Sequence, residues 1–297
     1  MHAQKEAIIE TAVKEGGKPW MDTEVEVDRA IQGIHTAINE IENLSGTQIP
    51  MGITKSSQNR LAFTTIEPVG VVLAISAFNH PVNLIVHQVI PAIAAGCPVI
   101  VKPASTTPLS CLNFVDLLYR AGLPKAYCQA LITTREDAEK LVSDKRISFL
   151  TFIGSGKVGW RLRAMVAPGV HCALEHGGAA PVIVEKDADL DKMIPSLLKG
   201  GYYHAGQVCV SVQRVYVHES IADEVLAGFT PQVKNLVVGN PLDKKTDVGP
   251  LISPKEVDRV EQWVNEAALS GGKILCGGKR ISRSEERRVG KECIVKC

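Results

Sequence analysis

Apolar residues recur three and four positions apart through much of the first fifty residues of the chain. Residues at that spacing fall on one face of a helix, so the pattern predicts two packing helices. The apolar positions are Ile8, Ile9, Ala12 and Val13 in the first stripe, and Val27, Ile31, Ile34, Ile38 and Ile41 in the second.

From Leu61 onward the pattern changes to short apolar and β-branched runs that alternate with helical ones. A strand or hairpin is expected to lead through the turn residues Pro68 and Gly70 into a strand at residues 71–75. Strands that alternate with helices indicate a mostly parallel sheet covered by helices, so the predicted fold class is α/β. Further strands are predicted at 99–101, 147–152 and 181–184, and helices at 108–119 and 157–165.

Composition excludes several classes of protein. The chain has 297 residues, 45% of them hydrophobic, which allows one large α/β unit or two smaller domains. A net charge of +1 gives no electrostatic reason to expect binding to nucleic acid or to an anionic membrane. The apolar stretch at 89–101 is interrupted by Pro91, Gly96 and Pro98 and is too short to span a bilayer.

The eight cysteines lack the paired spacing of zinc sites. In a chain of this length they fit a reducing compartment better than a disulfide framework. The N-terminal residues carry charge and lack the apolar core and cleavage site of a secretory signal. The expected location is therefore cytoplasmic, and no metal is expected.

Three polar residues, far apart in the sequence, together offer the chemistry of acyl transfer. Cys209 lies in the run Gly-Gln-Val-Cys-Val-Ser, Glu175 begins the run Glu-His-Gly-Gly, and Asn79 lies in Phe-Asn-His-Pro. Taken singly, a free cysteine is more often a small core residue, and the other two fit ordinary turn positions. Their combination and order favour a nucleophile, a base and an amide that act together.

On these motifs the chain resembles the aldehyde dehydrogenase superfamily, NAD(P)-dependent and non-acylating, from about Gly17 to about Lys279. The family's catalytic Cys, Glu and Asn fall on Cys209, Glu175 and Asn79, and the separation of 34 residues between Glu175 and Cys209 agrees with the family spacing. The resemblance implies oxidation of an aldehyde to a carboxylic acid through a thiohemiacetal and a thioester on the cysteine. It also implies that Asn79 and the backbone N–H of Cys209 hold the oxyanion.

Glu175 follows two apolar residues and precedes two glycines, so it is expected at a strand end that faces a crevice. A partly desolvated carboxylate has a raised pKa and can deprotonate water near neutrality, as hydrolysis of a thioester requires. CoA-acylating relatives generally lack a carboxylate at this position. The presence of Glu175 therefore argues for hydrolysis.

The expected cofactor is NADP or NAD. A glycine-rich turn at residues 152–159 joins a predicted strand to a predicted helix, where backbone N–H groups could bind a pyrophosphate. The turn is similar to the family's Phe-x-Gly-Ser pattern, and the resemblance also implies that a lysine holds the adenosine ribose. The expected cofactor-binding residues are Lys102, Ser105, Gly154, Ser155, Val158 and Ser76.

Ser105 bears on the choice of cofactor. An acid at this position would bind the 2′-hydroxyl of NAD and repel the 2′-phosphate of NADP. A small neutral hydroxyl admits the phosphate, so NADP is expected to be accepted.

The resemblance also implies a domain division. A cofactor-binding domain is expected over residues 1–178, with a bridging hairpin near 56–70, followed by an incomplete α/β catalytic domain over 179–280. Residues 281–297 are predicted to be a foreign or disordered tail, and the sequence resembles a member truncated at both ends. The full-length parent is expected to form a homodimer or homotetramer. Its substrate is expected to be a small aldehyde, because the run at 83–87 is similar to relatives that act on small hydroxy- or phospho-aldehydes.

Four positions depart from the family pattern. Phe78 and His80 flank Asn79 in place of Trp and Phe, His176 replaces the usual Leu, and Gln88 replaces a common Lys. The loss of that lysine removes one route for handling protons.

Two other functions remain open on the sequence. A fragment that retains only nucleotide binding would bind the cofactor without turnover. A cysteine hydrolase that pairs Cys209 with His204 would hydrolyse esters without a nicotinamide, although the two residues are only five apart and a third partner is missing.

Overall fold

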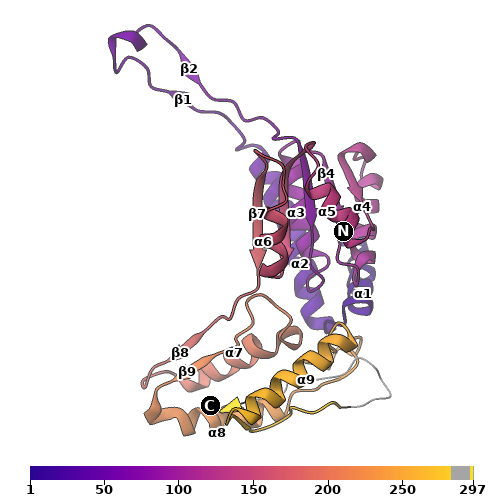
Figure 1. The fold of residues 1–297 in the computed structure, drawn as a ribbon, viewed down its shortest axis with the longest axis vertical. Helices are drawn as coiled ribbons and strands as arrows, with labels where there is room; N and C mark the ends of the chain where they lie inside the picture. Colours follow the sequence, from indigo (N-terminus) through magenta and orange to yellow (C-terminus); the bar gives the residue numbers. More distant parts are fainter. Residues whose placement is uncertain (282–294, 297) are drawn as a thin grey trace.

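The computed structural model describes residues 1–281 and 295–296. Figure 1 shows an upper body that contains a sheet, a lower lobe built mainly of helices, and a long hairpin that projects from the upper body. The chain passes from the body to the lobe after the last strand of the sheet.

A five-stranded sheet in the order β5-β4-β3-β6-β7 forms the centre of the upper body. All neighbouring strands in it are parallel, which confirms the predicted α/β class. The strand order reverses beside β3, and ligands of such sheets bind at the carboxyl ends of the strands near this point. The strands are β3 (Val71–Ile75), β4 (Val99–Lys102), β5 (Cys128–Ala130), β6 (Ile147–Gly154) and β7 (His171–His176).

Helices cover both faces of this sheet. One core joins β3 and β4 to the helices α1, α2, α3 and α4, and a second core joins β6 and β7 to α5 and α6. The helices are α1 (Lys5–Gly16), α2 (Trp20–Ile41), α3 (Asn83–Ala94), α4 (Pro108–Arg120), α5 (Arg135–Val142) and α6 (Gly156–Arg163). Short 3₁₀ turns lie at η1 (His2–Gln4) and η3 (Lys125–Tyr127).

The two N-terminal helices predicted from the apolar stripes are confirmed, and the stripes are buried as far as Ile31. The prediction that the second stripe packs along its whole length is wrong. Ile38 and Ile41 are 55% and 49% exposed, because the C-terminal part of α2 extends past the core that buries its beginning.

The lower lobe contains α7 (Leu190–Tyr202), α8 (Ala222–Lys234), α9 (Pro254–Leu269) and two short strand pairs. The strand predicted at 181–184 forms as β8 (Val182–Val184), but it pairs with β9 (Val215–Val217) outside the central sheet. The other pair is β10 (Lys273–Ile274) with β11 (Val295–Lys296). The 3₁₀ turn η4 (Tyr203–Gly206) precedes the loop that carries Cys209, and η5 (Glu219–Ile221) precedes α8.

The projecting hairpin consists of β1 (Gln48–Ile49) and β2 (Ala62–Phe63), with η2 (Lys55–Ser57) in its tip. It begins earlier in the sequence than the expected 56–70. Figure 1 shows it extending away from the body, and several apolar side chains along it are exposed, including Ile53 at 87% and Leu61 at 75%.

The tail predicted at 281–297 lies almost entirely outside the described residues, apart from Ile281 and the two residues of β11. Within the described ranges, every helix is too short or too polar to cross a membrane. The same ranges contain no cluster of three or more His, Cys, Asp or Glu side chains that could hold a metal ion.

Candidate functional site

Cys209 follows a sharply bent segment. In η4, His204 and Ala205 have φ values of 48° and 54°, and Gly206 continues the left-handed run at 69°. This conformation costs a residue with a side chain about 1–2 kcal/mol, and such strain often lies at functional sites. The bend ends the path of α7 and brings the chain from the buried His204 to the exposed Cys209.

Asn79 lies against the backbone just before Cys209. It follows β3, and its Nδ2 donates a hydrogen bond of 2.9 Å to the carbonyl of Gln207. The amide has two hydrogens, so one stays free for a second acceptor. The backbone N–H of Cys209 has no acceptor within the described part of the chain. Donors of this kind, one from a side chain and one from the backbone, are the groups from which an oxyanion site is built.

Glu175 is the second-last residue of β7, at the strand end that the sequence predicts. Three residues later, the N–H of Gly178 donates to the carbonyl of Cys209 at 3.1 Å. The structure therefore brings the three segments that carry Cys209, Glu175 and Asn79 into contact. Their side chains make no hydrogen bond with one another in the described residues.

The side chain of Glu175 was expected to be partly buried, and this expectation is wrong. The structure shows it exposed. β7 is an edge strand, and its residues alternate between two faces. His176 and Leu174 face α6 and its core, whereas Glu175 faces the opposite side. There α3 packs over the central strands β3 and β4 and leaves the end of β7 uncovered.

The glycine-rich turn joins β6 directly to α6. Ser155 is the N-cap of α6 and is exposed, and no side chain among the described residues caps this helix end. A Cβ at Gly154 would lie 2.6 Å from Cζ of Phe152, and one at Gly159 would lie 2.1 Å from Nε2 of His176. The packing thus requires glycine at both positions. It leaves the first backbone N–H groups of α6 directed at the carboxyl end of the sheet, where an anion could bind.

The other predicted cofactor residues surround the neighbouring strand ends. The N–H of Ser76, just after β3, donates to the carbonyl of Lys102 at the end of β4. The Oγ of Ser76 is buried without a partner in the described residues. Burial lowers the pKa of Lys102, whose Nζ donates to the adjacent Pro103 carbonyl at 3.2 Å. Ser105 is exposed, and Val158 packs into the α6 core.

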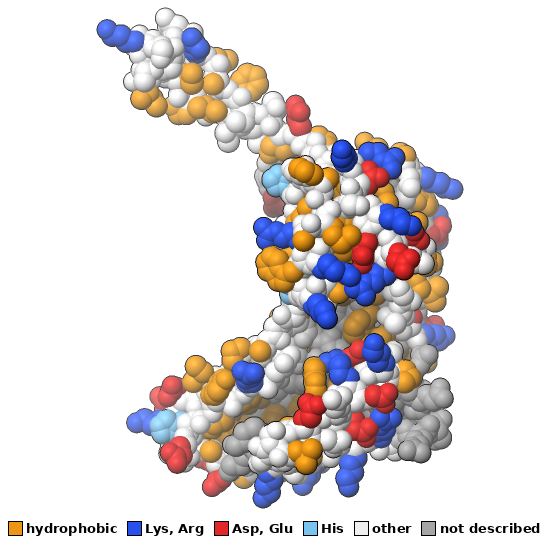
Figure 2. Space-filling view, in the orientation of Figure 1, with side chains coloured by type: hydrophobic (Ala, Val, Ile, Leu, Met, Phe, Trp, Pro, Cys, Tyr) orange, Lys and Arg blue, Asp and Glu red, His pale blue; other side chains and the backbone are white. Residues whose placement is uncertain are grey.

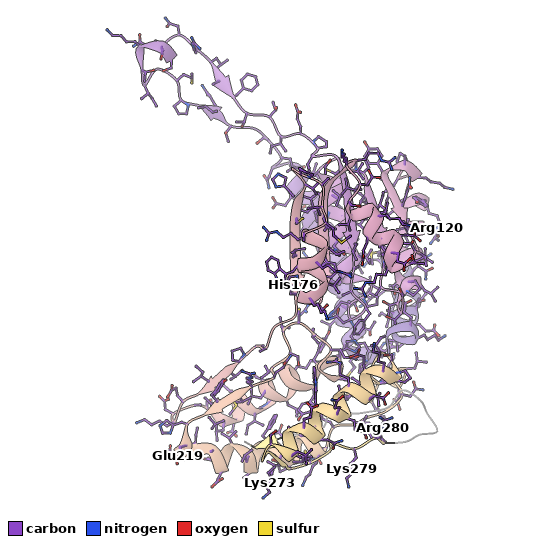
Figure 3. All side chains as sticks on the ribbon, in the orientation of Figure 1. Arg120, His176, Glu219, Lys273, Lys279 and Arg280 are labelled. Carbon is purple, nitrogen blue, oxygen red and sulfur yellow. The ribbon has the colours of Figure 1, made fainter. Side chains whose placement is uncertain are left out.

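Three histidines lie around this region in different settings. His176 packs edge-on against Phe152 and Trp160, at the lower end of the body in Figure 3. His80 lies 3.2 Å from the hydroxyl of Tyr203, and burial, with the charge of Lys18, lowers its pKa to about 3. His80 is therefore neutral near pH 7.

His204 is fully buried beside Phe78, and burial, with the charge of Lys18, holds its pKa well below the ordinary value. Both of its ring nitrogens lack a hydrogen-bond partner in the described part of the chain. His204 therefore does not contact the thiol of Cys209 as a base, which argues against the cysteine hydrolase.

Gln88 joins the two strands at the point where the strand order reverses. Its Nε2 donates to the carbonyl of Ile75 in β3 at 3.3 Å and to the carbonyl of Thr151 in β6 at 3.2 Å. A buried amide at this position ties the end of β3 to the middle of β6.

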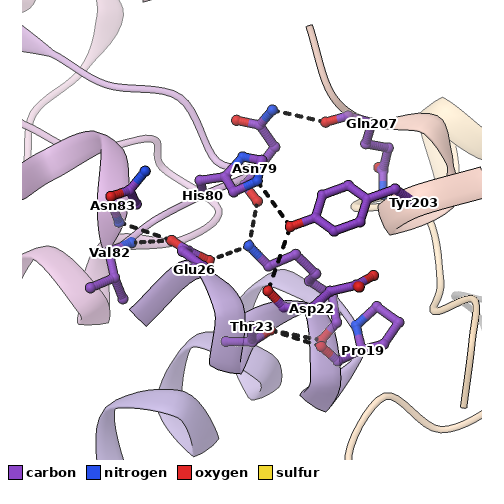
Figure 4. A network of polar contacts seen from close by, with 11 residues as sticks. Pro19, Asp22, Thr23, Glu26, Asn79, His80, Val82, Asn83, Tyr203 and Gln207 are labelled. Atoms are coloured by element: carbon purple, nitrogen blue, oxygen red, sulfur yellow. Dashed lines mark hydrogen bonds and ion pairs between the residues drawn. The ribbon is translucent and has the colours of Figure 1, made fainter. Parts of the chain in front are cut away.

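Sequence reasoning missed a buried ion pair next to Asn79. Lys18 and Glu26 pair in the interior, and Lys18 also donates to the carbonyl of Asn79 at 3.1 Å (Figure 4). A signal was present, because Glu26 stands on the buried face of α2 next to Val27 and one turn before Ala30. An acid in an apolar stripe indicates a buried partner.

The fold and the site define a doubly wound α/β protein with a glycine-rich strand-to-helix turn and an exposed thiol near the carboxyl ends of its strands. Figure 2 shows the molecule hollowed on one side, between the upper body and the lower lobe. A model of the aldehyde dehydrogenase family matches residues 1–295. The chain belongs to the aldehyde dehydrogenase family, which confirms the resemblance found in the sequence.

Similar proteins agree with this assignment. The chain is 41% identical over 280 residues to the 3-sulfolactaldehyde dehydrogenase of Priestia aryabhattai, covering 94% of the chain and 58% of that protein. It matches the structure of aldehyde dehydrogenase 21 from Physcomitrella patens, in complex with the reaction product succinate, with a TM-score of 0.93 and 39% identity, covering 99% and 60% of the two chains. It matches the NADP complex of glyceraldehyde-3-phosphate dehydrogenase GapN from Methanocaldococcus jannaschii DSM 2661 with a TM-score of 0.89 and 40% identity, covering 94% and 61%. The chain thus spans 58% to 61% of the length of these relatives.

Proposed function

We propose that the protein is an NAD(P)-dependent, non-acylating aldehyde dehydrogenase that oxidises an aldehyde to a carboxylic acid. The observation that carries this proposal is the contact between the three segments. Asn79 bonds the carbonyl of Gln207, and Gly178, just after Glu175, bonds the carbonyl of Cys209. These contacts support a site in which the exposed thiol of Cys209 acts together with the amide of Asn79 and the carboxylate of Glu175.

The roles follow from the chemistry of each group. The thiolate of Cys209 forms a C–S bond to the aldehyde carbon, and the oxyanion accepts hydrogen bonds from Asn79 and from the backbone N–H of Cys209. When the oxyanion collapses, the carbon loses its hydride and a thioester remains. Glu175 takes a proton from water, which adds to the thioester and breaks the C–S bond to release the acid.

NAD(P)⁺ bound at the glycine-rich turn would accept the hydride. Three features of the chain fit this group. Among the described residues, no side chain caps the N-terminus of α6, and the buried Oγ of Ser76 lacks a partner. At Gly154, the ring of Phe152 leaves no room for a side chain at the turn. Lys102 would contact the adenosine ribose. The exposed, neutral Ser105 would accept a 2′-phosphate, in line with the NADP complex of the related GapN structure.

The proposed substrates are small hydroxy- or phosphorylated aldehydes. The names of two similar proteins support this class, since one is a dehydrogenase of 3-sulfolactaldehyde and another of glyceraldehyde-3-phosphate. A panel of such aldehydes, compared with unsubstituted aldehydes of equal chain length, tests it. Equal kcat/KM across the two sets would contradict the assignment.

We further propose that a domain boundary lies at residue 178 and that the protein is located in the cytoplasm.

We also propose that the protein self-associates through the hairpin. The two strands of the hairpin pair over two residues each, and the hairpin exposes apolar side chains. Isolated two-stranded hairpins are barely stable in water. A second copy of the protein would cover these side chains. Sedimentation velocity would show a dimer or tetramer that a Leu61→Asp substitution weakens.

The function is tested by replacing the base. In Glu175→Ala the thioester should form but not hydrolyse, so NADPH should appear as a burst of about one equivalent per site followed by slow turnover. Cys209→Ala should show no burst, and Glu185→Ala, which removes an exposed acid outside the site, should behave like the unsubstituted protein. An unaffected steady-state rate in Glu175→Ala would remove Glu175 from the mechanism.

A further inference from the structure

The Lys18–Glu26 pair is buried to an unusual degree for two charged side chains. Lys18 lies in the turn between α1 and α2, and Glu26 lies in α2, with side chains only 2% and 0% exposed. Such burial is unfavourable unless both groups are paired and their remaining hydrogen-bonding atoms are satisfied. Burial lowers the pKa of Lys18, and the Glu26 carboxylate opposes that effect.

The remaining hydrogen bonds of the pair all go to one segment. One oxygen of Glu26 pairs with Lys18, and the other accepts the backbone N–H groups of Val82 at 2.8 Å and Asn83 at 3.0 Å. These are the N-terminal donors of α3, which has no side-chain cap of its own. The carboxylate therefore satisfies the start of α3 from a different helix.

Lys18 holds the other end of the same segment. Its Nζ donates to the carbonyl of Asn79, and the side chain of Asn79 reaches across to the carbonyl of Gln207. Figure 4 shows these contacts as one continuous network from α2 to the segment that precedes Cys209. The backbone of Asn79 is thus fixed on one side by a buried cation, and its amide projects from the other.

Helix α2 also contacts the lower lobe. Asp22 pairs with Lys199 of α7, and the hydroxyl of Tyr203 lies between the Asp22 carbonyl and His80. The segments that carry Asn79 and Cys209 are therefore both anchored to the first two turns of α2.

We propose that Lys18 and Glu26 are positioning residues that fix the backbone of Asn79 and so direct its side-chain amide at the carbonyl that Cys209 attacks. This inference rests on the proposed function, in which Asn79 supplies an oxyanion donor. A displacement of about 1 Å in such a donor can reduce the rate about 100-fold. The pair acts through Asn79 and touches no reacting atom.

A double-mutant cycle separates this role from a general effect on folding. Lys18→Met should lower kcat by about 10- to 100-fold and leave the KM for the cofactor unchanged. Asn79→Ala should lower kcat by about 100- to 1000-fold. In the Asn79→Ala background, Lys18→Met should have little further effect, because the group that it positions is gone. Full multiplication of the two effects would overturn the proposal.

The matched control is Lys14→Met. Lys14 lies on α1, one turn before Lys18, and its pair with Glu10 is exposed. This variant removes the same atoms and the same charge, so its kcat should equal that of the unsubstituted protein. A similar loss of kcat in both variants would show that charge alone is responsible and would contradict positioning by Lys18.

A second variant and a readout independent of turnover complete the test. Glu26→Gln keeps an acceptor for Val82 and Asn83 but removes the charge beside Lys18, so it serves if Lys18→Met does not fold.

The side-chain amide signal of Asn79 in a ¹H–¹⁵N spectrum should move or broaden in either variant and remain in place in Lys14→Met. If the unsubstituted protein oxidises no aldehyde, the proposed function fails, and the amide signal still decides the inference. An unmoved signal would overturn it.

Discussion

The residues just before Cys209 are far more buried than Cys209 itself. His204 is 1% exposed and Ala205 is inaccessible, whereas Cys209 is exposed only a few positions later. The left-handed run in η4 makes this change of direction possible within one short turn. At the scale of single residues, the site thus depends on a strained backbone held by buried neighbours.

Cofactor choice is also decided at a single residue. Ser105→Glu should lower kcat/KM for NADP about 10-fold or more relative to NAD, because the new carboxylate would repel the 2′-phosphate. Steady-state kinetics with both cofactors measures the ratio. Ser105→Gln, of equal size but neutral, should change the ratio far less. A protein that strongly prefers NAD, with a preference that Ser105→Glu leaves unaltered, would refute the assignment of Ser105.

Two helices of the body are capped at their N-termini by a carboxylate from another helix. Neither α3 nor α4 has a side-chain cap from its own N-cap residue. Glu26 of α2 accepts the first N–H groups of α3, and Glu15 of α1 accepts those of α4 from Leu109 and Ser110. At the scale of elements, α1 and α2 therefore stabilise the next two helices as well as covering the sheet.

Glu15→Ala should lower the free energy of unfolding by about 1–2 kcal/mol, because α4 would lose the acceptor for its first two N–H groups. Urea unfolding followed by circular dichroism measures the change. Glu10→Ala, on the same helix and in an exposed pair with Lys14, should change stability by less than about 0.5 kcal/mol. Equal stability of the two variants would show that the cap contributes nothing.

The whole molecule depends on the junction between body and lobe. Contacts from the start of α2, such as the hydrogen bond from the N–H of Trp20 to the carbonyl of Pro241, meet there with those of Asn79 and His80. His80 and His204 lie in this junction, and burial lowers the pKa of both. Protonation of either ring would therefore destabilise the folded junction.

This arrangement predicts sensitivity to acid. The folded pKa of His80 is about 3 against an ordinary 6.5, so between these values the unfolded chain binds a proton that the folded chain does not. Stability should therefore fall as the pH drops from about 6.5 toward 3, by at most about 1.4 kcal/mol per pH unit for each such histidine. Urea unfolding at a series of pH values should show a smaller slope in His80→Phe and an unchanged slope in His171→Asn, which replaces an exposed ring. An unchanged slope in His80→Phe would exclude His80 as a source.

Local patterns were sufficient for part of this protein. The periodicity of apolar residues depends on near neighbours alone, and it was enough to predict several elements. These are the helices α1 and α2 and the strands β3, β4 and β6. The helix α3 was not predicted, because its residues are apolar on nearly every side and the run contains Pro91. The motifs around Cys209, Glu175 and Asn79 indicated the family without any structure.

Only the tertiary structure decided how these pieces meet. It determined the strand order, the separate pairing of β8 with β9, the exposure of Glu175 on an edge strand, and the burial of Lys18 with Glu26. Each of these features depends on contacts between residues far apart in the chain. Those contacts follow from how the faces of helices and sheets pack, and from which polar groups are removed from water by that packing. The sequence by itself determined which groups are present and the local elements that carry them. Packing alone decided which of these groups are buried, paired or left exposed.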